Sequence, residues 1–324
     1  MALAARVDRR LFRAAGWALA ALVVVLVGRV LLRDLSELRA QPIRITADWL
    51  AIVFSGALFL GAHAVLVQTW RSVLGCWDAH LPFWTSARIW SVSNLARYLP
   101  LKVWQIAAMG AMARDAGVSP IAATGSAILG TIVNVLAGFV VALLGGRALL
   151  DRASQGHGTL AFVLVVAGAG ALVAAPVVLP RIAPWLGRAI GRPVRAQLPV
   201  RAVLYALIGN VVAWLLYGAA FQAFMTGILG DTAGGYPEYL AAYTISYLVG
   251  YLALFAPAGI GAREGAMVAV LVYAGLATRP QAALIALTSR VWLTLLEVVP
   301  GFLFWAHAAL RRRSRTTDSS DVPT

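Results

Sequence analysis

The sequence predicts an all-α protein, a polytopic membrane helical bundle with about eight spans and one re-entrant, broken helical hairpin. Of its 324 residues 61% are hydrophobic and 12% are charged, and the mean hydropathy is +0.81. So little polar surface cannot coat a soluble globule. The 27 Lys and Arg residues outnumber the 13 Asp and Glu residues and mostly flank apolar runs, which is typical of the loops between membrane spans.

The first apolar run, residues 14–32, follows a basic amino terminus and is long enough to cross about 30 Å of hydrocarbon. Arg29 and Arg33 stand where a signal peptide would need small residues for cleavage. We therefore expect a retained span with a cytoplasmic amino terminus. Further spans are expected at 49–67, 120–145, 160–179, 203–228, 239–256, 262–276 and 281–307.

Eight crossings return the chain to the side on which it began, so we expect both termini in the cytoplasm of a bacterial inner membrane. The turn at 230–238 contains no Lys or Arg and is therefore placed outside. Residues 1–310 form a single membrane domain in this interpretation. Residues 311–324 form a basic cytoplasmic tail with a disordered end.

A ladder of mostly small residues follows the span 120–145 at a strict spacing of four. Small residues let another helix approach closely, and packing drives helix association inside a membrane. We therefore interpret the glycines of the ladder as packing positions and Asn134 as a candidate cavity-lining residue. The ladder consists of Ser126, Gly130, Asn134, Gly138 and Ala142.

The stretch 83–112 is amphipathic and is interrupted by Pro100, with Arg97 and Lys102 on either side. Proline removes a backbone donor and disfavours a helical conformation at the residue before it, so a helix must break here. Each arm is too short to cross the membrane alone. We therefore expect a helical hairpin that dips in from the cytoplasmic side.

A second interruption, at 255–265, contains Pro257 and two glycines before Arg263 and Glu264. A helix that restarts there has unpaired N–H groups and a positive dipole end, which attract anions. A cation in its first turn opposes the dipole, which indicates a negative ligand. The alternative is that Arg263 and Lys102 extend to lipid headgroups. Glu264 either complements the helix terminus, pairs with Arg263, or acts as a coupling group.

Arg290 and Glu297 lie seven residues apart in the last predicted span, on one helix face and about 10 Å from each other. Charges at this depth are costly in lipid, so both must face the bundle interior and find partners. We expect Arg290 or Arg263 to neutralise Glu297. Both a proton-coupled role for Glu297 and a static ion pair remain open.

Other site chemistries find no support in the sequence. The single cysteine, Cys76, excludes an intramolecular disulfide, and the four histidines show no metal-ligand spacing. We interpret His63 as a hydrogen-bonded packing residue. Gly259-Ile-Gly261 is not a dinucleotide fingerprint, since no strand precedes it. We expect no cofactor, no metal and no nucleic-acid partner.

The two interruptions resemble those of the lysylphosphatidylglycerol-synthase transmembrane-region family, the flippase-like membrane proteins. The resemblance is carried by Arg97-Tyr-Leu-Pro with Lys102-Val-Trp-Gln105, and by the segment Pro257-Ala-Gly-Ile-Gly-Ala-Arg-Glu-Gly265. The family more often has glycine where this chain has Leu101. In larger members this domain is thought to translocate an aminoacylated phospholipid, and a separate carboxy-terminal domain performs the aminoacyl transfer. This chain stops soon after Arg315, so we do not expect synthase activity.

The resemblance and the buried charges together imply a translocase for an anionic phospholipid or a polyprenyl-phosphate-linked lipid. One alternative is a membrane enzyme with Glu264 or Glu297 as base. Another is a non-catalytic partner of a lipid-modifying glycosyl- or aminoacyltransferase. Membrane lipids are the expected partners. The candidate substrate-binding residues are Arg97, Tyr98, Lys102, Gln105, Asn134, Arg263, Glu264, Arg290 and Glu297.

Overall fold

The described part of the chain is entirely helical, with turns and no strands. The computed structural model describes residues 45–98, 103–147, 199–230, 233–253 and 259–318, together with short pieces between 163 and 185. The predicted span 14–32 therefore lies outside the described residues, and the span 160–179 is described only in pieces. An all-α membrane protein is what the composition predicted.

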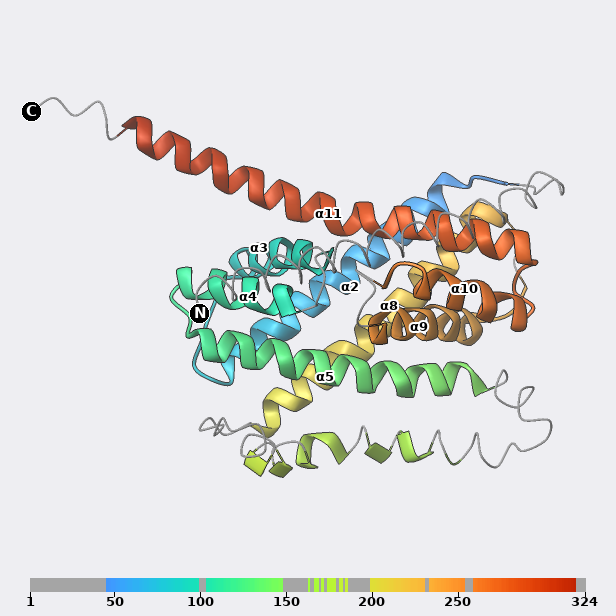
Figure 1. Ribbon diagram of the computed structural model, residues 1–324, viewed down its shortest axis with the longest axis horizontal. Coiled ribbons are helices and arrows are strands. Elements are labelled where there is room, and N and C mark those ends of the chain that lie inside the picture. The colour runs from blue at the N-terminus through green and yellow to red at the C-terminus, as the bar shows by residue number, and fades with distance from the viewer. Residues whose placement is uncertain are drawn as a thin grey trace, which may run out of the picture.

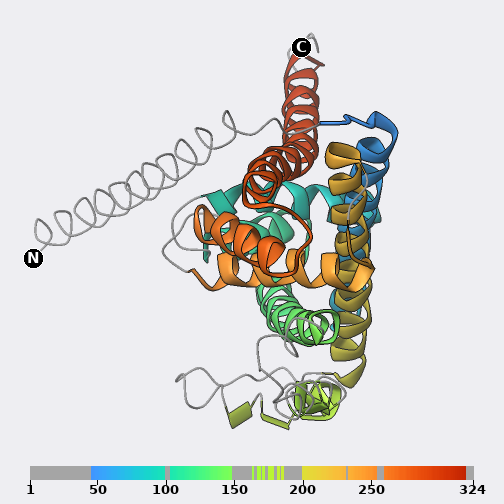
Figure 2. The same ribbon diagram turned by 90° about the vertical axis from the view of Figure 1, so that its right-hand side faces the viewer.

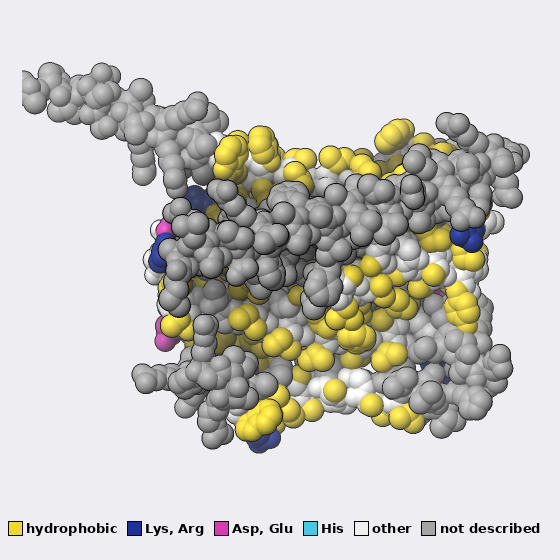
Figure 3. Space-filling model, in the orientation of Figure 1, with side chains coloured by type: hydrophobic (Ala, Val, Ile, Leu, Met, Phe, Trp, Pro, Cys, Tyr) yellow, Lys and Arg dark blue, Asp and Glu magenta, His cyan; other side chains and the backbone are white. Residues whose placement is uncertain are grey.

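Four helices of the described residues are long and apolar enough to cross a membrane. They are α2 (Trp49–Gly75), α5 (Pro120–Gly145), α8 (Val200–Leu229) and the segment Arg279–His307 of α11 (Arg279–Asp318). Figure 3 shows hydrophobic side chains over the middle of one face, with the visible charged side chains near the edges of the view. This distribution suits a protein surrounded by lipid.

Helix α2 and helix α8 form the most extensive pair of the bundle and lie side by side (Figure 2). Gly209 permits this approach, because a Cβ atom there would collide with the side chain of Thr69. At one end of the pair, the backbone N–H of Asp48 donates to the carbonyl of Gly227 (2.8 Å). The Asp48 carboxylate also caps α2 by accepting from the N–H groups of Leu50 and Ala51.

The remaining helices are short and form two pairs at opposite ends of the long helices (Figure 1). One pair is α3 (Phe83–Asn94), which continues into the 3₁₀ turn η1 (Leu95–Tyr98), and α4 (Val103–Asp115). The other pair is α9 (Tyr236–Leu252) and α10 (Ala262–Tyr273). Helix α11 contacts both pairs through α3, η1 and α10.

The length of α10 does not fit the full span that was predicted at 262–276. With 12 residues, α10 rises about 18 Å, which is less than the roughly 30 Å that a membrane crossing needs. The apolar run 262–276 predicted a full span, but the helix ends at Tyr273 and Gly275 then adopts a φ of +69°. The pair α3 and α4, with 12 and 13 residues, has the short arms that were predicted for a hairpin.

Helix α11 continues without interruption to Asp318, past the boundary at residue 310 that the sequence predicted. The basic residues 311–315 are therefore helical, and residues 319–324 lie outside the described part. Helix α5 begins and ends at the predicted residues, because Pro120 occupies its first position and Gly146 follows its last turn.

Candidate functional site

A cavity lies between the long helices and is bordered by both short pairs. It leaves about 1130 Å³ free of protein atoms, its open mouth included. Residues from α2, α3, α4, α5, α8, α9 and α11 line it. Its described lining mixes amides, hydroxyls and aromatic rings with the carboxylate of Glu297, and it includes no Lys or Arg among the described side chains.

Two asparagines on facing long helices are hydrogen-bonded to each other on the cavity wall. The Asn134 Nδ2 donates to Oδ1 of Asn210 (2.8 Å), and the Asn210 Nδ2 donates to the carbonyl of Ala206 (2.7 Å). The indole N–H of Trp214 donates to the carbonyl of Asn134 (3.0 Å). Interhelical amide bonds of this kind join spans inside a membrane. Asn134 thus both lines the cavity, as predicted, and links α5 to α8.

The small-residue ladder of α5 serves two purposes, and only one of them was predicted. A Cβ atom at Gly138 would lie 3.0 Å from the Trp214 ring, so this glycine is a packing position as expected. At Gly130 a Cβ atom would meet none of the described atoms within 4 Å, and this residue lines the cavity. Among the described residues, Gly130 therefore borders the cavity and not a neighbouring helix, which the packing interpretation did not foresee.

On the side of the cavity formed by α3 and α4, a hydrogen bond between two uncharged side-chain amides joins the two helices. The Gln105 Nε2 donates to Oδ1 of Asn94 (2.5 Å), and both residues line the cavity. Asn94 is buried, with 4% of its surface exposed. This hydrogen bond links α3 to α4 across the break between them. Gln105 therefore has a structural partner and also faces the cavity.

The opposite side of the cavity carries a row of tyrosines from α9. Tyr243, Tyr247 and Tyr251 line the cavity and follow one another at intervals of four residues, which places them on one helix face. Tyr243 stacks on Tyr217 of α8 with ring centroids 5.7 Å apart, and Tyr217 contacts Nδ1 of His63 through its hydroxyl (3.2 Å). His63 therefore has the hydrogen-bonded packing role that the sequence suggested.

Behind this row lies Arg263, in the first turn of α10, with 9% of its surface exposed. Its guanidinium carbon is 5.2 Å from the Tyr243 ring centroid and 5.5 Å from that of Tyr247, the geometry of cation–π contacts. Its Nη2 is buried and has no hydrogen-bond partner among the described residues. A buried guanidinium N–H without an acceptor is costly, and Arg263 itself is not among the described residues that line the cavity.

Glycines position Arg263 against α9. A Cβ atom at Gly250 would lie 2.7 Å from Cβ of Arg263, and one at Gly259 would lie 2.5 Å from the carbonyl oxygen of Gly250. Gly259 and Gly261 have φ values of +71° and +89°, which favour glycine. The glycines of the second break therefore let the chain turn tightly and bring the arginine onto the tyrosine row.

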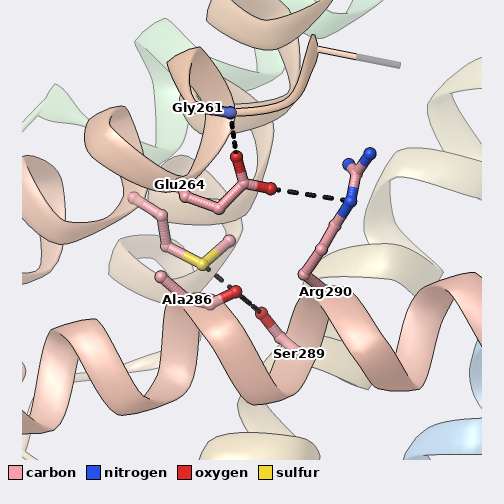
Figure 4. A network of polar contacts seen from close by, with 6 residues as sticks. Gly261, Glu264, Ala286, Ser289 and Arg290 are labelled. Atoms are coloured by element: carbon pink, nitrogen blue, oxygen red, sulfur yellow. Dashed lines mark hydrogen bonds and ion pairs between the residues drawn. The ribbon is translucent and has the colours of Figure 1, made fainter. Parts of the chain in front are cut away.

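Glu264 closes the same turn and pairs with Arg290 (Figure 4). Its Oε2 accepts from the N–H of Gly261 (2.6 Å) and so caps the start of α10, while its Oε1 lies 3.6 Å from Nε of Arg290. Of the roles considered for Glu264, helix capping is therefore seen directly. Its ion-pair partner across the helix interface is Arg290.

Glu297 lies on the cavity wall and within electrostatic range of Arg263. This agrees with the expectation that Arg263 or Arg290 neutralises it. Among the side chains that the structure describes, Arg263, Glu264, Arg290 and Glu297 are the charged residues of this region where α10 and α11 meet.

The structure brings together most of the predicted site residues whose side chains it describes. Asn134, Gln105 and Glu297 line one cavity, and Arg263 lies behind its tyrosine wall, with Glu264 and Arg290 beside it. The predictions for Lys102 and for the side chains of Arg97 and Tyr98 lie outside the described part of the chain. Within the described residues no group of three or more His, Cys, Asp or Glu could hold a metal ion.

Sequence reasoning missed the tyrosine row and Asn210. The signal for the row was present, since tyrosines occur at 239, 243, 247 and 251, a spacing that defines a helix face. Asn210 gave no comparable signal, because its partner Asn134 lies 76 residues away.

Comparison with known proteins adds no relative to these observations. No model of a known protein family matches the chain, and no curated protein matches it.

Proposed function

We propose that this chain is a flippase-like lipid translocase, which moves an anionic phospholipid or a polyprenyl-phosphate-linked lipid between the leaflets of a bacterial plasma membrane. The observation that carries the proposal is a polar cavity among long apolar helices, bordered by two pairs of short helices, with the buried Arg263 behind its wall. Membrane lipids are its proposed partners.

The proposed topology has six crossings and two re-entrant hairpins. The crossings are the predicted spans 14–32 and 160–179 with α2, α5, α8 and α11. The α3–α4 hairpin follows the carboxyl end of α2 and enters from the cytoplasm, whereas the α9–α10 hairpin follows that of α8 and enters from outside. Six crossings, like eight, leave both termini in the cytoplasm. Helix breaks at the centre of the membrane, reached from both sides, are typical of transporters.

The chemistry of the cavity suits the headgroup of such a lipid. Its amides, tyrosine hydroxyls and indoles offer hydrogen bonds, and a headgroup that leaves water needs these to replace its hydration. Arg263 supplies a guanidinium for a phosphate, a pairing with strong charge-assisted hydrogen bonds. The acyl or prenyl tails remain in the surrounding lipid, so the cavity has to accommodate only the polar end.

Reconstituted vesicles test the proposal with two variants of the same helix. Gly130 and Gly125 of α5 both have open space at Cβ, but Gly130 lines the cavity and Gly125 is exposed. Vesicles with fluorescent phosphatidylglycerol and an outer-leaflet quencher report lipid movement. We expect wild type and Gly125→Leu to accelerate the movement of the fluorescent lipid. With Gly130→Leu we expect a rate at least tenfold lower than with wild type.

Wild-type vesicles that move the fluorescent lipid no faster than protein-free vesicles would overturn translocation itself. Equal rates for the two leucine variants would overturn the cavity as the route. Both variants are checked beforehand for a single symmetric peak in size-exclusion chromatography, so that a loss of rate is not a loss of folded protein.

A further inference from the structure

A second pocket lies at the carboxyl end of α2, beside the start of α8. It leaves about 1230 Å³ free of protein atoms, its open mouth included. The last turns of α2, the turn that follows them and the first residues of α8 line it, and we call it the end pocket. Among its described lining residues, those that can carry charge are Arg71, Asp78, His80 and Arg201. The described lining therefore has more cationic than anionic side chains.

The end pocket and the cavity lie on different faces of α2. Thr69 and Val73 line the cavity, whereas Arg71 and Gly75 line the end pocket, and residues two apart on a helix point about 200° away from each other. Helix α8 also lies close against α2 here, since a Cβ atom at Gly209 would lie 1.8 Å from Oγ1 of Thr69. The end pocket is therefore a site apart from the cavity.

Arg71 lies near the level of the lipid headgroups. From Trp49, the first residue of α2, to Arg71 the helix rises about 33 Å, slightly more than the roughly 30 Å of the hydrocarbon layer. Arg201 is the second residue of α8 and lies at the same end, because it lines the same pocket. The phosphate groups of the surrounding lipids lie at this level.

The guanidinium of Arg71 is held in place by two hydrogen bonds. Its Nε donates to the carbonyl of Leu81 (2.9 Å), and its Nη1 donates to Oε1 of Gln68 (2.8 Å). A guanidinium has five N–H donors, so these two bonds orient the group without using all of them. A guanidinium that is already oriented loses little conformational freedom when it binds an anion.

Arg201 stands at the head of a row of exposed apolar side chains on α8. It is itself exposed, and exposed residues follow it at intervals of three or four, which places them on one helix face. A row of this kind suits contact with an acyl chain, so the ligand with the best fit has both a phosphate and a tail. The row consists of Tyr205, Ile208, Val212 and Leu215.

We propose that the end pocket binds the phosphate of an anionic phospholipid from the adjacent leaflet. Arg71 and Arg201 form charge-assisted hydrogen bonds with the phosphate oxygens, and the acyl chains lie along the exposed row of α8. The negative charge of the lipid offsets the cationic excess of the described lining. This site is independent of lipid movement through the cavity and so goes beyond the proposed function.

Cys76 reports directly whether the end pocket is occupied. It is the single cysteine of the sequence and lines the pocket. The rate of its labelling by N-ethylmaleimide is measured on the detergent-purified chain with dihexanoyl phosphatidylglycerol, with zwitterionic dihexanoyl phosphatidylcholine, and with inorganic phosphate at matched concentrations. A ligand at ten times its dissociation constant leaves roughly a tenth of the sites free. We therefore expect phosphatidylglycerol to slow the labelling about tenfold, and the other two compounds to leave the rate nearly unchanged.

Two glutamine variants locate the protection. Arg201→Gln is expected to lose most of it, and because Arg201 is exposed the substitution leaves the fold in place. Arg114→Gln removes the same charge from an exposed position at the end of α4 and should keep the protection. Rates with and without lipid are compared within each variant. An equal loss in both variants would show a general attraction of charge and overturn the pocket.

Unchanged labelling of the wild type in phosphatidylglycerol would overturn the proposal. Equal protection by inorganic phosphate would overturn a lipid as the ligand, and equal protection by phosphatidylcholine would overturn the need for net negative charge.

Gly130→Leu separates this site from the proposed function, because its side chain fills the cavity and not the end pocket. Protection that persists in Gly130→Leu supports the end pocket, and protection that is lost assigns the effect to the cavity and overturns the proposal. Lipid movement in vesicles without protection of Cys76 overturns the end pocket alone. Protection without lipid movement overturns translocation alone.

Discussion

At the break between α9 and α10 the cation that follows the glycines is buried within a charged group, whereas at the break between α3 and α4 the described contacts are between neutral amides. Arg263 lies on Tyr243 and Tyr247, while Gln105 bonds to Asn94. Both breaks show proline followed by a cation in the sequence. Among the side chains that the structure describes at the two breaks, the buried charges are those of Arg263 and Glu264 at the second one.

The largest expected effect on stability and on lipid movement is at the break between α9 and α10. Arg263→Ala removes the buried guanidinium that lies over Tyr243 and Tyr247 and interacts with Glu264 and Glu297, and breaking a buried charge interaction costs roughly 3–5 kcal/mol. Thermal unfolding in detergent should show a large loss of stability, and lipid movement should cease. Arg279→Ala is the matched control, because Arg279 is exposed at the start of α11. Equal behaviour of the two variants would remove Arg263 from the site.

A smaller loss of stability is expected from a substitution at Gly250, the glycine that packs against Arg263. In Gly250→Ala the new methyl group would lie 2.7 Å from Cβ of Arg263, and such overpacking costs about 1–3 kcal/mol. Gly265→Ala in α10 meets nothing within 4 Å and should be neutral or stabilising by up to about 1 kcal/mol. Unfolding midpoints in the same detergent compare the two. Stabilisation of both would contradict the close contact between α9 and α10.

At the break between α3 and α4 we expect a smaller loss of stability than at the break between α9 and α10. Gln105→Ala removes the donor to the buried Oδ1 of Asn94, and a buried acceptor without its partner costs about 1–3 kcal/mol. Thr226 of α8 is exposed, so Thr226→Ala should change stability by less than about 0.5 kcal/mol. If Gln105→Ala destabilises the protein more than Arg263→Ala does, the comparison between the breaks is reversed.

Labelling of Cys76 sharpens the comparison without changing stability. Cys76 follows α2 at the end next to the α3–α4 pair, and burial raises the pKa of its thiol, which Arg201 partly opposes. A raised pKa lowers the thiolate fraction, so an impermeant maleimide should react slowly at pH 7 and faster as pH rises. In sided vesicles we expect reaction from the cytoplasmic face only. A Cys76→Ser, Arg279→Cys chain should react from the other face.

The long helices were the most predictable part of the fold, because apolar runs bounded by proline or charge leave little choice inside a membrane. The bounds of α5 were predicted to the residue. Helix α2 continues to Gly75 rather than ending near 67, since Arg71 finds partners in the carbonyl of Leu81 and in Gln68. The short length of α10 was missed because hydropathy does not register the turn at Gly275.

At the site, the sequence predicted the charged residues and not their setting. A buried cation such as Arg263 is unusual enough to be noticed in a chain with 12% charged residues. Its tyrosine neighbours look like ordinary apolar helix residues until the helix face is drawn. The pairing of Glu264 with Arg290 depends on how α10 lies against α11, and no local pattern encodes that angle.

Pro300 gives α11 a further property. It lies inside the helix, three residues after Glu297, and proline there removes a backbone hydrogen bond and lowers the resistance to bending. Next to it, Gly301 rests against the carbonyl of Ser91 and the side chain of Leu95 in the α3 region. Bending of α11 at Pro300 would move the α3–α4 pair relative to the part of α11 that carries Arg290 and Glu297. One helix, with a proline between its two contact regions, therefore touches both of the short pairs that border the cavity.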